Sequence, residues 1–205
     1  MSGTVAIRGI EAEVDADPGD ILSRLQFGFM LFLEAHNSVW AFSLDGLYMN
    51  LDQPGPLGLT EIGLKQGMVE FTGYRRVMSW LEVLAGGRLN LISGEIEVLP
   101  AEGLPPESEV DGSQTWFDPF VGARVTVPAG RRWLFVLRGD VGGFGIGSDI
   151  AWQVYPAVSH RFSRLFGLSV AYRVLGMDYQ TGSGTDAFRY DLRIFGPEIG
   201  FLFHF

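Results

Sequence analysis

The chain has 205 residues, a formal net charge of −9, no cysteine, and an apolar content of 47%. This apolar content argues against intrinsic disorder, and the missing cysteines exclude disulfides and thiolate metal sites. The acidic balance argues against a nucleic-acid partner, because such a partner requires a basic protein face.

Apolar residues alternate with period two between glycine-rich turns, a pattern that predicts strands along almost the whole chain. We find no internal repeat and no linker, so we expect one domain over residues 1–205. In chain order the expected strands are 4–14, 25–36, 39–51, 59–75, 79–98, 115–127, 133–145, 149–161, 166–179 and 187–205.

The connections between these strands alternate in length and in charge. Short connections such as Pro128–Arg132 carry arginines, whereas long ones such as Asp15–Arg24 and Pro100–Gln114 carry mostly acidic residues. This layout is typical of an antiparallel up-and-down transmembrane β-barrel. We expect about ten strands, with eight as an alternative count.

No apolar run is long enough for a membrane-spanning helix, which needs about 18 residues or more without charges. A helical membrane protein is therefore excluded, whereas a barrel is not. Met1-Ser2-Gly3 leads directly into a strand-like segment without a secretory signal pattern. The chain is therefore either the mature form of an exported protein or a cytosolic protein.

The polar phase of the strands indicates which face points inward. On the strand from Trp133, the phase of Phe135 and Leu137 opposes the phase of Arg138 and Asp140. A lipid-facing arginine at the membrane midplane costs about 2–4 kcal/mol, so we expect the charged phase to face inward and to pair across a narrow interior. The predicted interior charge network consists of Glu82, Arg88, Asp118, Arg124, Arg138, Asp140 and Arg173.

The last strand departs from a single alternation. Phe188 and Tyr190 stand at even positions, whereas Ile199 and Phe201 stand at odd ones. One face of a strand cannot change phase without an extra residue, so the sequence predicts a β-bulge near Phe195–Pro197.

The ending "IGFLFHF" resembles the C-terminal signature of Gram-negative outer-membrane β-barrels, carried here by Ile199, Phe201, Phe203 and Phe205. The stretches "GYRR", "LAGGRLN", "WFDPFVGARV", "LRGDVGGFGIGSDIAWQ" and "AYRVLGMDY" look like small uncharacterised OmpA/OmpW-like transmembrane barrels. The resemblance implies a bacterial outer-membrane location, contact with membrane lipid and lipopolysaccharide, and recognition of the last strand by the barrel-assembly machinery. It implies no defined activity. We expect a monomer.

A search for chemistry finds no convincing nucleophile–base pair. His36, His160 and His204 all fall near the expected short-turn end, away from an outer-rim site, and they are too scattered for a metal site. The "GGFGIG" stretch at Gly142–Gly147 fits a tight hairpin better than a phosphate-binding loop, since no helix follows it. We therefore expect no catalytic, cofactor-binding or metal-binding residue, and no enzyme.

The primary functional expectation is an outer-membrane barrel with a structural, adhesive or interaction role through its long acidic loops, and with an interior largely filled by charged side chains. The first alternative is a narrow, porin-like channel for small or hydrophobic solutes. The second is a soluble calycin-like barrel that binds a lipophilic ligand.

Overall fold

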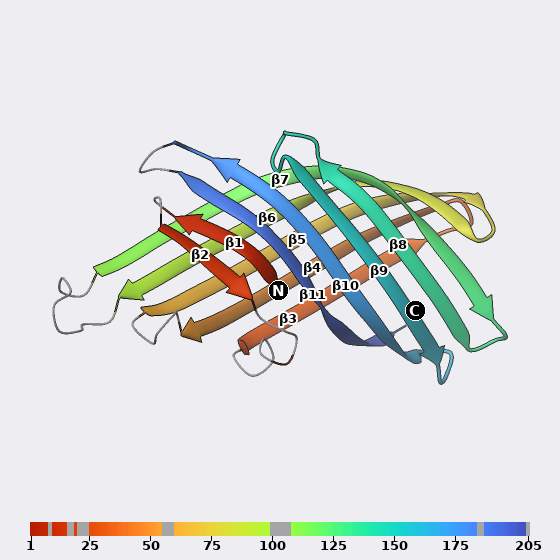
Figure 1. Cartoon of the computed structure of the whole chain (residues 1–205). Coiled ribbons are helices and arrows are strands. Elements are labelled where there is room, and N and C mark those ends of the chain that lie inside the picture. Colours follow the sequence, from red (N-terminus) through yellow and green to blue (C-terminus); the bar gives the residue numbers. More distant parts are fainter. Residues whose placement is uncertain are drawn as a thin grey trace.

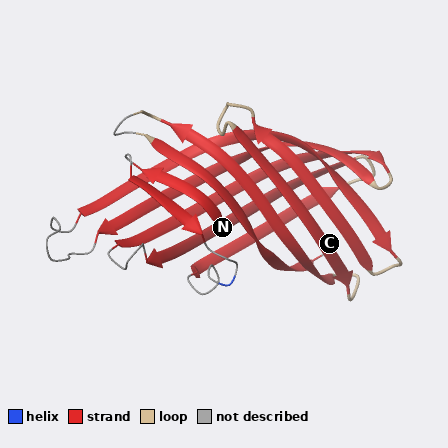
Figure 2. Cartoon of the chain, viewed as in Figure 1, coloured by secondary structure: helices blue, strands red, loops and turns tan. Residues whose placement is uncertain are grey.

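The computed structural model describes residues 1–7, 10–15, 19, 25–54, 60–98, 108–183 and 187–203. These residues form one antiparallel sheet, in which strands account for nearly all of the described chain (Figures 1 and 2). In chain order the strands are β1 (Ser2–Ile7), β2 (Ile10–Asp15), β3 (Leu25–His36), β4 (Trp40–Pro54), β5 (Thr60–Met78), β6 (Leu81–Val98), β7 (Ser108–Ala129), β8 (Trp133–Gly143), β9 (Ile150–Arg161), β10 (Phe166–Thr181) and β11 (Phe188–Phe203).

The strand order in the sheet is β2-β1-β11-β10-β9-β8-β7-β6-β5-β4-β3. Each strand from β3 to β11 pairs antiparallel with the next one in the sequence, so the prediction of an all-β, up-and-down antiparallel fold is confirmed. The sheet curls into a half-barrel (Figure 1), and Arg173 of β10 reaches Asp45 of β4 across its interior. The two end strands, β2 and β3, are not paired with each other.

Nine of the ten expected strands correspond to β3–β11, which rules out the eight-strand alternative. The remaining prediction, a single first strand over 4–14, is wrong. β1 and β2 form a hairpin there, in which Ile7 is the partner of Ile10 and Val5 is the partner of Ala12. Val5 of β1 is also the partner of Tyr190 on β11, and both side chains are buried.

The polarity of the half-barrel reverses along its axis. In the half nearer the long connections, here called the long-loop half, the interior is an apolar cluster and the exterior exposes Lys65, Arg189, Asp191 and Arg193. In the half nearer the short turns, the short-turn half, charged residues face inward and apolar residues face outward. The apolar interior cluster consists of Met1, Val5, Met49, Met68, Ile92, Trp116, Ala151, Leu175, Met177, Phe188, Tyr190 and Leu192.

This reversal explains the phase change on β11 without a bulge. The register between β10 and β11 runs without a shift through Val174–Phe195 and Tyr172–Pro197, so the bulge predicted near Phe195–Pro197 is wrong. Phe188 and Tyr190 point into the apolar interior of the long-loop half, whereas Phe201 is exposed on the outside of the short-turn half. The alternation of the strand is constant, and its surroundings change.

Among the described residues no helix has the length and apolar character needed to traverse a lipid bilayer.

Candidate functional site

The centre of the interior holds two arginines that share two carboxylates. Arg88 of β6 donates from Nε and Nη2 to Glu70 Oε2 at 3.1 and 2.9 Å, and from Nη2 to Asp140 Oδ1 at 3.0 Å. Arg138 of β8 forms ion pairs with the other oxygens of Glu70 and Asp140. The side chains of Arg88, Glu70 and Asp140 are fully buried, so the four charges compensate one another away from solvent.

A second group of ion pairs joins the two sides of the curled sheet. Arg173 of β10 donates from Nη2 to Asp45 Oδ2 of β4 at 2.7 Å and from Nε to Glu198 Oε1 of β11 at 2.6 Å. Its third nitrogen, Nη1, donates to Gln153 Oε1 at 3.1 Å. Because β4 and β10 are not neighbours in the sheet, this contact joins distant parts of it and stabilises its curl.

A third group lies toward the short turns. Arg124 of β7 donates from Nε to Glu82 Oε2 at 2.7 Å, and its Nη1 forms an ion pair with Glu34 of β3. Arg76 adds a contact from Nη2 to Glu82 Oε1 at 3.3 Å. Glu34 remains about one-fifth exposed, so this group is the most solvated of the three.

Polar and aromatic side chains link the three groups. Gln153 accepts from Arg173 and donates to Asp140 at 3.3 Å, which joins the first group to the second. Tyr74 accepts from Arg138 at 3.4 Å, and its ring lies 3.9 Å from the Arg124 guanidinium, which joins the first group to the third. Bidentate and stacked contacts of this kind use the planar guanidinium, which a lysine ammonium cannot reproduce.

Asp118 is buried but takes its hydrogen bonds from uncharged donors. Its Oδ2 accepts from Asn90 Nδ2 at 2.9 Å, Trp116 Nε1 at 3.0 Å and Ser148 Oγ at 2.9 Å, and its Oδ1 accepts from the Ser148 backbone N–H at 2.6 Å. Ser148 belongs to the turn between β8 and β9, which follows the "GGFGIG" stretch. The role of this glycine-rich turn is therefore to bring Ser148 onto Asp118.

Replacing Gly147 with alanine is expected to loosen this turn. A Cβ at Gly147 would lie 2.3 Å from the Phe117 carbonyl oxygen and 2.6 Å from Asp118 Oδ1, so backbone must shift. We expect a loss of about 1–3 kcal/mol in the free energy of unfolding, measured by urea titration followed by tryptophan fluorescence. Gly139→Ala is the matched control, since its new methyl group meets nothing closer than the Gln153 carbonyl oxygen at 3.8 Å. Equal stabilities of the two variants would contradict this role.

Six of the seven residues predicted for the interior charge network take part in these ion pairs, and the seventh, Asp118, does not. Their partners Glu34, Asp45, Glu70 and Glu198 were missed by the sequence reasoning. Glu70 could have been found, because it stands directly opposite Arg88 in the β5–β6 register. The other three contact their arginines across the interior or diagonally, where no sequence spacing indicates the partner.

The outer face of the short-turn half is a continuous apolar surface, here called the outer belt. Its side chains come from all strands from β3 to β11 and are typically about half exposed. The tryptophans Trp40, Trp80 and Trp133 lie exposed at its short-turn rim. Further members are Phe29, Leu31, Phe42, Leu44, Val69, Phe71, Val83, Leu89, Phe117, Val121, Phe135, Leu137, Val154, Val170 and Tyr172.

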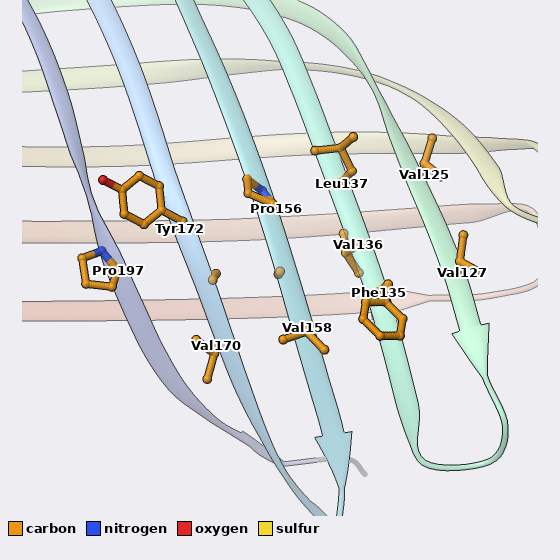
Figure 3. A pocket seen from close by; sticks show the side chains of 12 residues that line it. Val125, Val127, Phe135, Val136, Leu137, Pro156, Val158, Val170, Tyr172 and Pro197 are labelled. Carbon is orange, nitrogen blue, oxygen red and sulfur yellow. The ribbon is translucent and has the colours of Figure 1, made fainter.

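The outer belt contains a shallow apolar groove over β7–β11. Figure 3 shows Leu137, Val170, Tyr172 and the two prolines Pro156 and Pro197 around it. Pro197 is the Cα partner of Tyr172 on one side. On the other side, the pairing of β10 with β9 is interrupted. Cα partners run up to Ala171–Ala157 and resume at Val174–Val154. The prolines thus flank β10 where they remove backbone donors from the ladder.

The residues of the C-terminal signature lie on this same outer face. Ile199, Phe201 and Phe203 are 73%, 68% and 65% exposed on β11, and Phe205 lies outside the described residues. They are among the most exposed large apolar side chains of the described chain, and they continue the outer belt to its short-turn rim.

Two of the three histidines are described, and both lie at short-turn ends of strands. His36 is exposed, 3.7 Å from Glu34, and the ring of His160 packs against Trp133 and Phe162. His204 lies outside the described residues. Within the described ranges no group of three or more histidine or acidic side chains is arranged to hold a metal ion.

Comparison with protein-family models, with curated proteins and with solved structures finds no match to this chain.

Proposed function

We propose that this chain is an integral outer-membrane β-barrel whose outer belt contacts lipid and whose interior is filled by the arginine–carboxylate network. The single observation that carries the proposal is the reversed polarity of the short-turn half. There, large apolar side chains lie outside and ion pairs lie inside. Exposed apolar surface of this extent marks a membrane or protein contact, because soluble monomers expose only small patches.

The dimensions of the outer belt support the same proposal. Its outward apolar residues run from Val83 to Leu91 on β6, from Phe117 to Val127 on β7 and from Trp133 to Val141 on β8. These stretches are roughly nine to eleven residues long, which is the length that a tilted strand needs to cross a bilayer. The tryptophans at one rim fit an aromatic girdle, and the charged exterior of the long-loop half fits a position above the lipid.

The filled interior supports a structural or interaction role in preference to transport. The side chains of Arg88, Glu70 and Asp140 are fully buried inside the half-barrel, and Arg173 of β10 reaches across it to Asp45 of β4. We assign the interaction role to the long acidic connections, of which the Glu102–Glu107 stretch lies outside the described residues. Membrane lipid, lipopolysaccharide and the barrel-assembly machinery are the partners we propose for a monomer.

Refolding into lipid tests this proposal. Protein diluted from urea into phospholipid vesicles is expected to float with them and to migrate on a gel in a heat-modifiable form, whereas in plain buffer it should aggregate. A monodisperse protein in plain buffer would contradict the proposal and favour the soluble calycin-like alternative.

Conductance measurements test the structural role against the narrow channel. In planar bilayers the protein should show no stable unitary conductance steps. Steps that change in the Arg138→Ala variant would favour the narrow channel.

A further inference from the structure

Four exposed arginines gather on two neighbouring short turns. Arg131 and Arg132 belong to the turn between β7 and β8, and Arg161 and Arg164 lie at the turn between β9 and β10. The backbone N–H of Arg161 donates to the Arg132 carbonyl oxygen at 2.8 Å, which joins the two turns. These four residues are here called the arginine cluster.

The arginine cluster lacks the carboxylate partners that the interior arginines have. Each of the four arginines of the interior network contacts at least two carboxylates, whereas the arginine cluster forms no ion pair with any described residue. The connections 37–39, 79–80, 130–132 and 162–165 contain no aspartate or glutamate. The cluster is therefore a local positive charge on a chain whose net charge is −9.

The two turns hold the arginine cluster on a defined backbone. Ser163 Oγ accepts from the backbone N–H groups of Leu165 and Phe166 at 3.3 and 3.0 Å. The backbone N–H groups of Phe162 and Ser163 both donate to the Phe166 carbonyl oxygen at 3.0 Å. In the other turn Gly130 adopts a φ of 67°, which a glycine reaches without steric cost. A ligand that binds here would mainly have to order side chains, which limits the entropic cost of binding.

A row of aromatic rings runs beside the arginine cluster on the outer face. Successive ring centroids along this row are 4.4, 4.7, 5.7 and 6.0 Å apart. The row begins on β8, directly after the β7–β8 turn, and ends on β11 in the outer belt. Its members, here called the aromatic row, are Trp133, His160, Phe162, Phe166 and Phe201.

The β9–β10 turn alternates between cationic and apolar side chains. Phe162 and Leu165, which each follow an arginine of the cluster, are 54% and 66% exposed. Water alone does not favour the exposure of two large apolar side chains in one short turn. The headgroup region of a bilayer suits both kinds of residue, because aromatic and apolar side chains reach the acyl chains while cationic groups meet the phosphates.

We propose that the arginine cluster binds the phosphate of an anionic phospholipid, whose acyl chains lie on the outer belt beside the aromatic row. The inference rests on the proposed membrane function. A planar guanidinium donates two parallel hydrogen bonds to phosphate oxygens. A headgroup with net negative charge complements four unpaired arginines, whereas the choline of a zwitterionic lipid would add a cation beside them. The short-turn rim thereby has a lipid partner of its own, at the opposite end from the long acidic connections.

Lipid titration of a matched pair of double variants tests this inference. Arg132→Gln/Arg161→Gln removes one arginine of the cluster from each turn. Arg189→Gln/Arg193→Gln removes the same charge from the exposed outer surface of the long-loop half. Each chain is refolded into detergent micelles and titrated with phosphatidylglycerol or with phosphatidylcholine, and native mass spectrometry counts the lipids that it retains.

We expect the unmodified chain to retain phosphatidylglycerol with at least tenfold higher affinity than phosphatidylcholine. The affinity for phosphatidylglycerol should fall about fivefold for each arginine removed from the cluster, or about 25-fold in Arg132→Gln/Arg161→Gln. The control variant should change it less than twofold. Equal retention of the two lipids by the unmodified chain, or equal losses in the two variants, would overturn the inference.

Two further titrations identify the source of the phosphate. Retention of phosphatidylglycerol should survive an equal concentration of inorganic phosphate, because the acyl chains contribute to binding, and displacement by inorganic phosphate would overturn the inference. Tighter retention of lipid A than of phosphatidylglycerol, lost in Arg132→Gln/Arg161→Gln, would overturn the assignment to a phospholipid in favour of lipopolysaccharide.

Flotation with phosphatidylcholine vesicles reports on the proposed function separately. The Arg132→Gln/Arg161→Gln variant should float as the unmodified chain does, because the outer belt is unchanged. Absence of lipid selectivity in a chain that floats would overturn the inference and leave the proposed function intact. An unmodified chain that does not float would contradict the proposed function, and the micelle titration then decides the inference by itself.

Discussion

Replacing Glu70 with alanine is expected to lower the free energy of unfolding by about 3–5 kcal/mol, because it leaves two buried guanidiniums, Arg88 and Arg138, short of a carboxylate. Glu70 is fully buried and contacts both arginines. Each would keep Asp140 as its remaining ion-pair partner. The measurement is urea unfolding of the refolded protein in vesicles, followed by tryptophan fluorescence.

The matched control for Glu70 is Asp191→Ala, which also removes one carboxylate from an arginine. Asp191 lies on the outside, half exposed and 3.6 Å from Arg189. Exposed ion pairs of this kind contribute about 0–1 kcal/mol to the free energy of unfolding. If the two variants lost the same stability, the interior network would not act as the core of the short-turn half.

Replacing Val121 with arginine is expected to destabilise the vesicle-bound protein by about 2–4 kcal/mol, the cost of an arginine on the lipid face near the bilayer midplane. Val121 is 50% exposed on β7, in the middle of the outer belt. On a water-facing surface the same change would alter stability by no more than about 0.5 kcal/mol. The experiment therefore separates a lipid-facing wall from a solvated one.

Ser113→Arg provides the control on the same strand. Ser113 is exposed on β7 in the long-loop half, beyond the apolar stretch that begins at Phe117. We expect this variant to stay within about 1 kcal/mol of the unmodified chain, as arginines near the interface do. Equal losses in Val121→Arg and Ser113→Arg, or no loss in either, would argue against a bilayer around the outer belt.

The interior of the short-turn half combines the charge network with a small buried apolar cluster of Ala41, Tyr74, Leu84 and Phe120. Arg88, Arg124, Arg138 and Arg173 each contact at least two carboxylates, and aromatic rings such as Phe120 lie close to the guanidiniums. A network of this kind is specific because each cation has fixed partners on defined strands. The network is also sensitive to substitution, because removing one partner leaves a buried charge without an ion-pair partner.

Much of the architecture followed from the sequence by itself, because strand periodicity is a local property. The alternation around Arg138 and Asp140 identified the inward phase of β8, and turn composition identified most limits of β3–β11 to within a few residues. The main exception is β7, which begins at Ser108 and not at the predicted residue 115. Local pattern also placed Trp133 at a strand end. These features depend only on neighbouring residues and on the fact that side chains alternate across a strand.

Only the tertiary structure decided which charges meet and where the polarity reverses. Arg173 contacts Asp45 because the sheet curls. Asp118 contacts Ser148 because the turn between β8 and β9 folds back onto β7. The phase change along β11, interpreted from sequence as a bulge, is a change of environment along a regular strand. Alternation assigns residues to two faces, but curl and register determine what each face contacts, and these arise from the whole sheet.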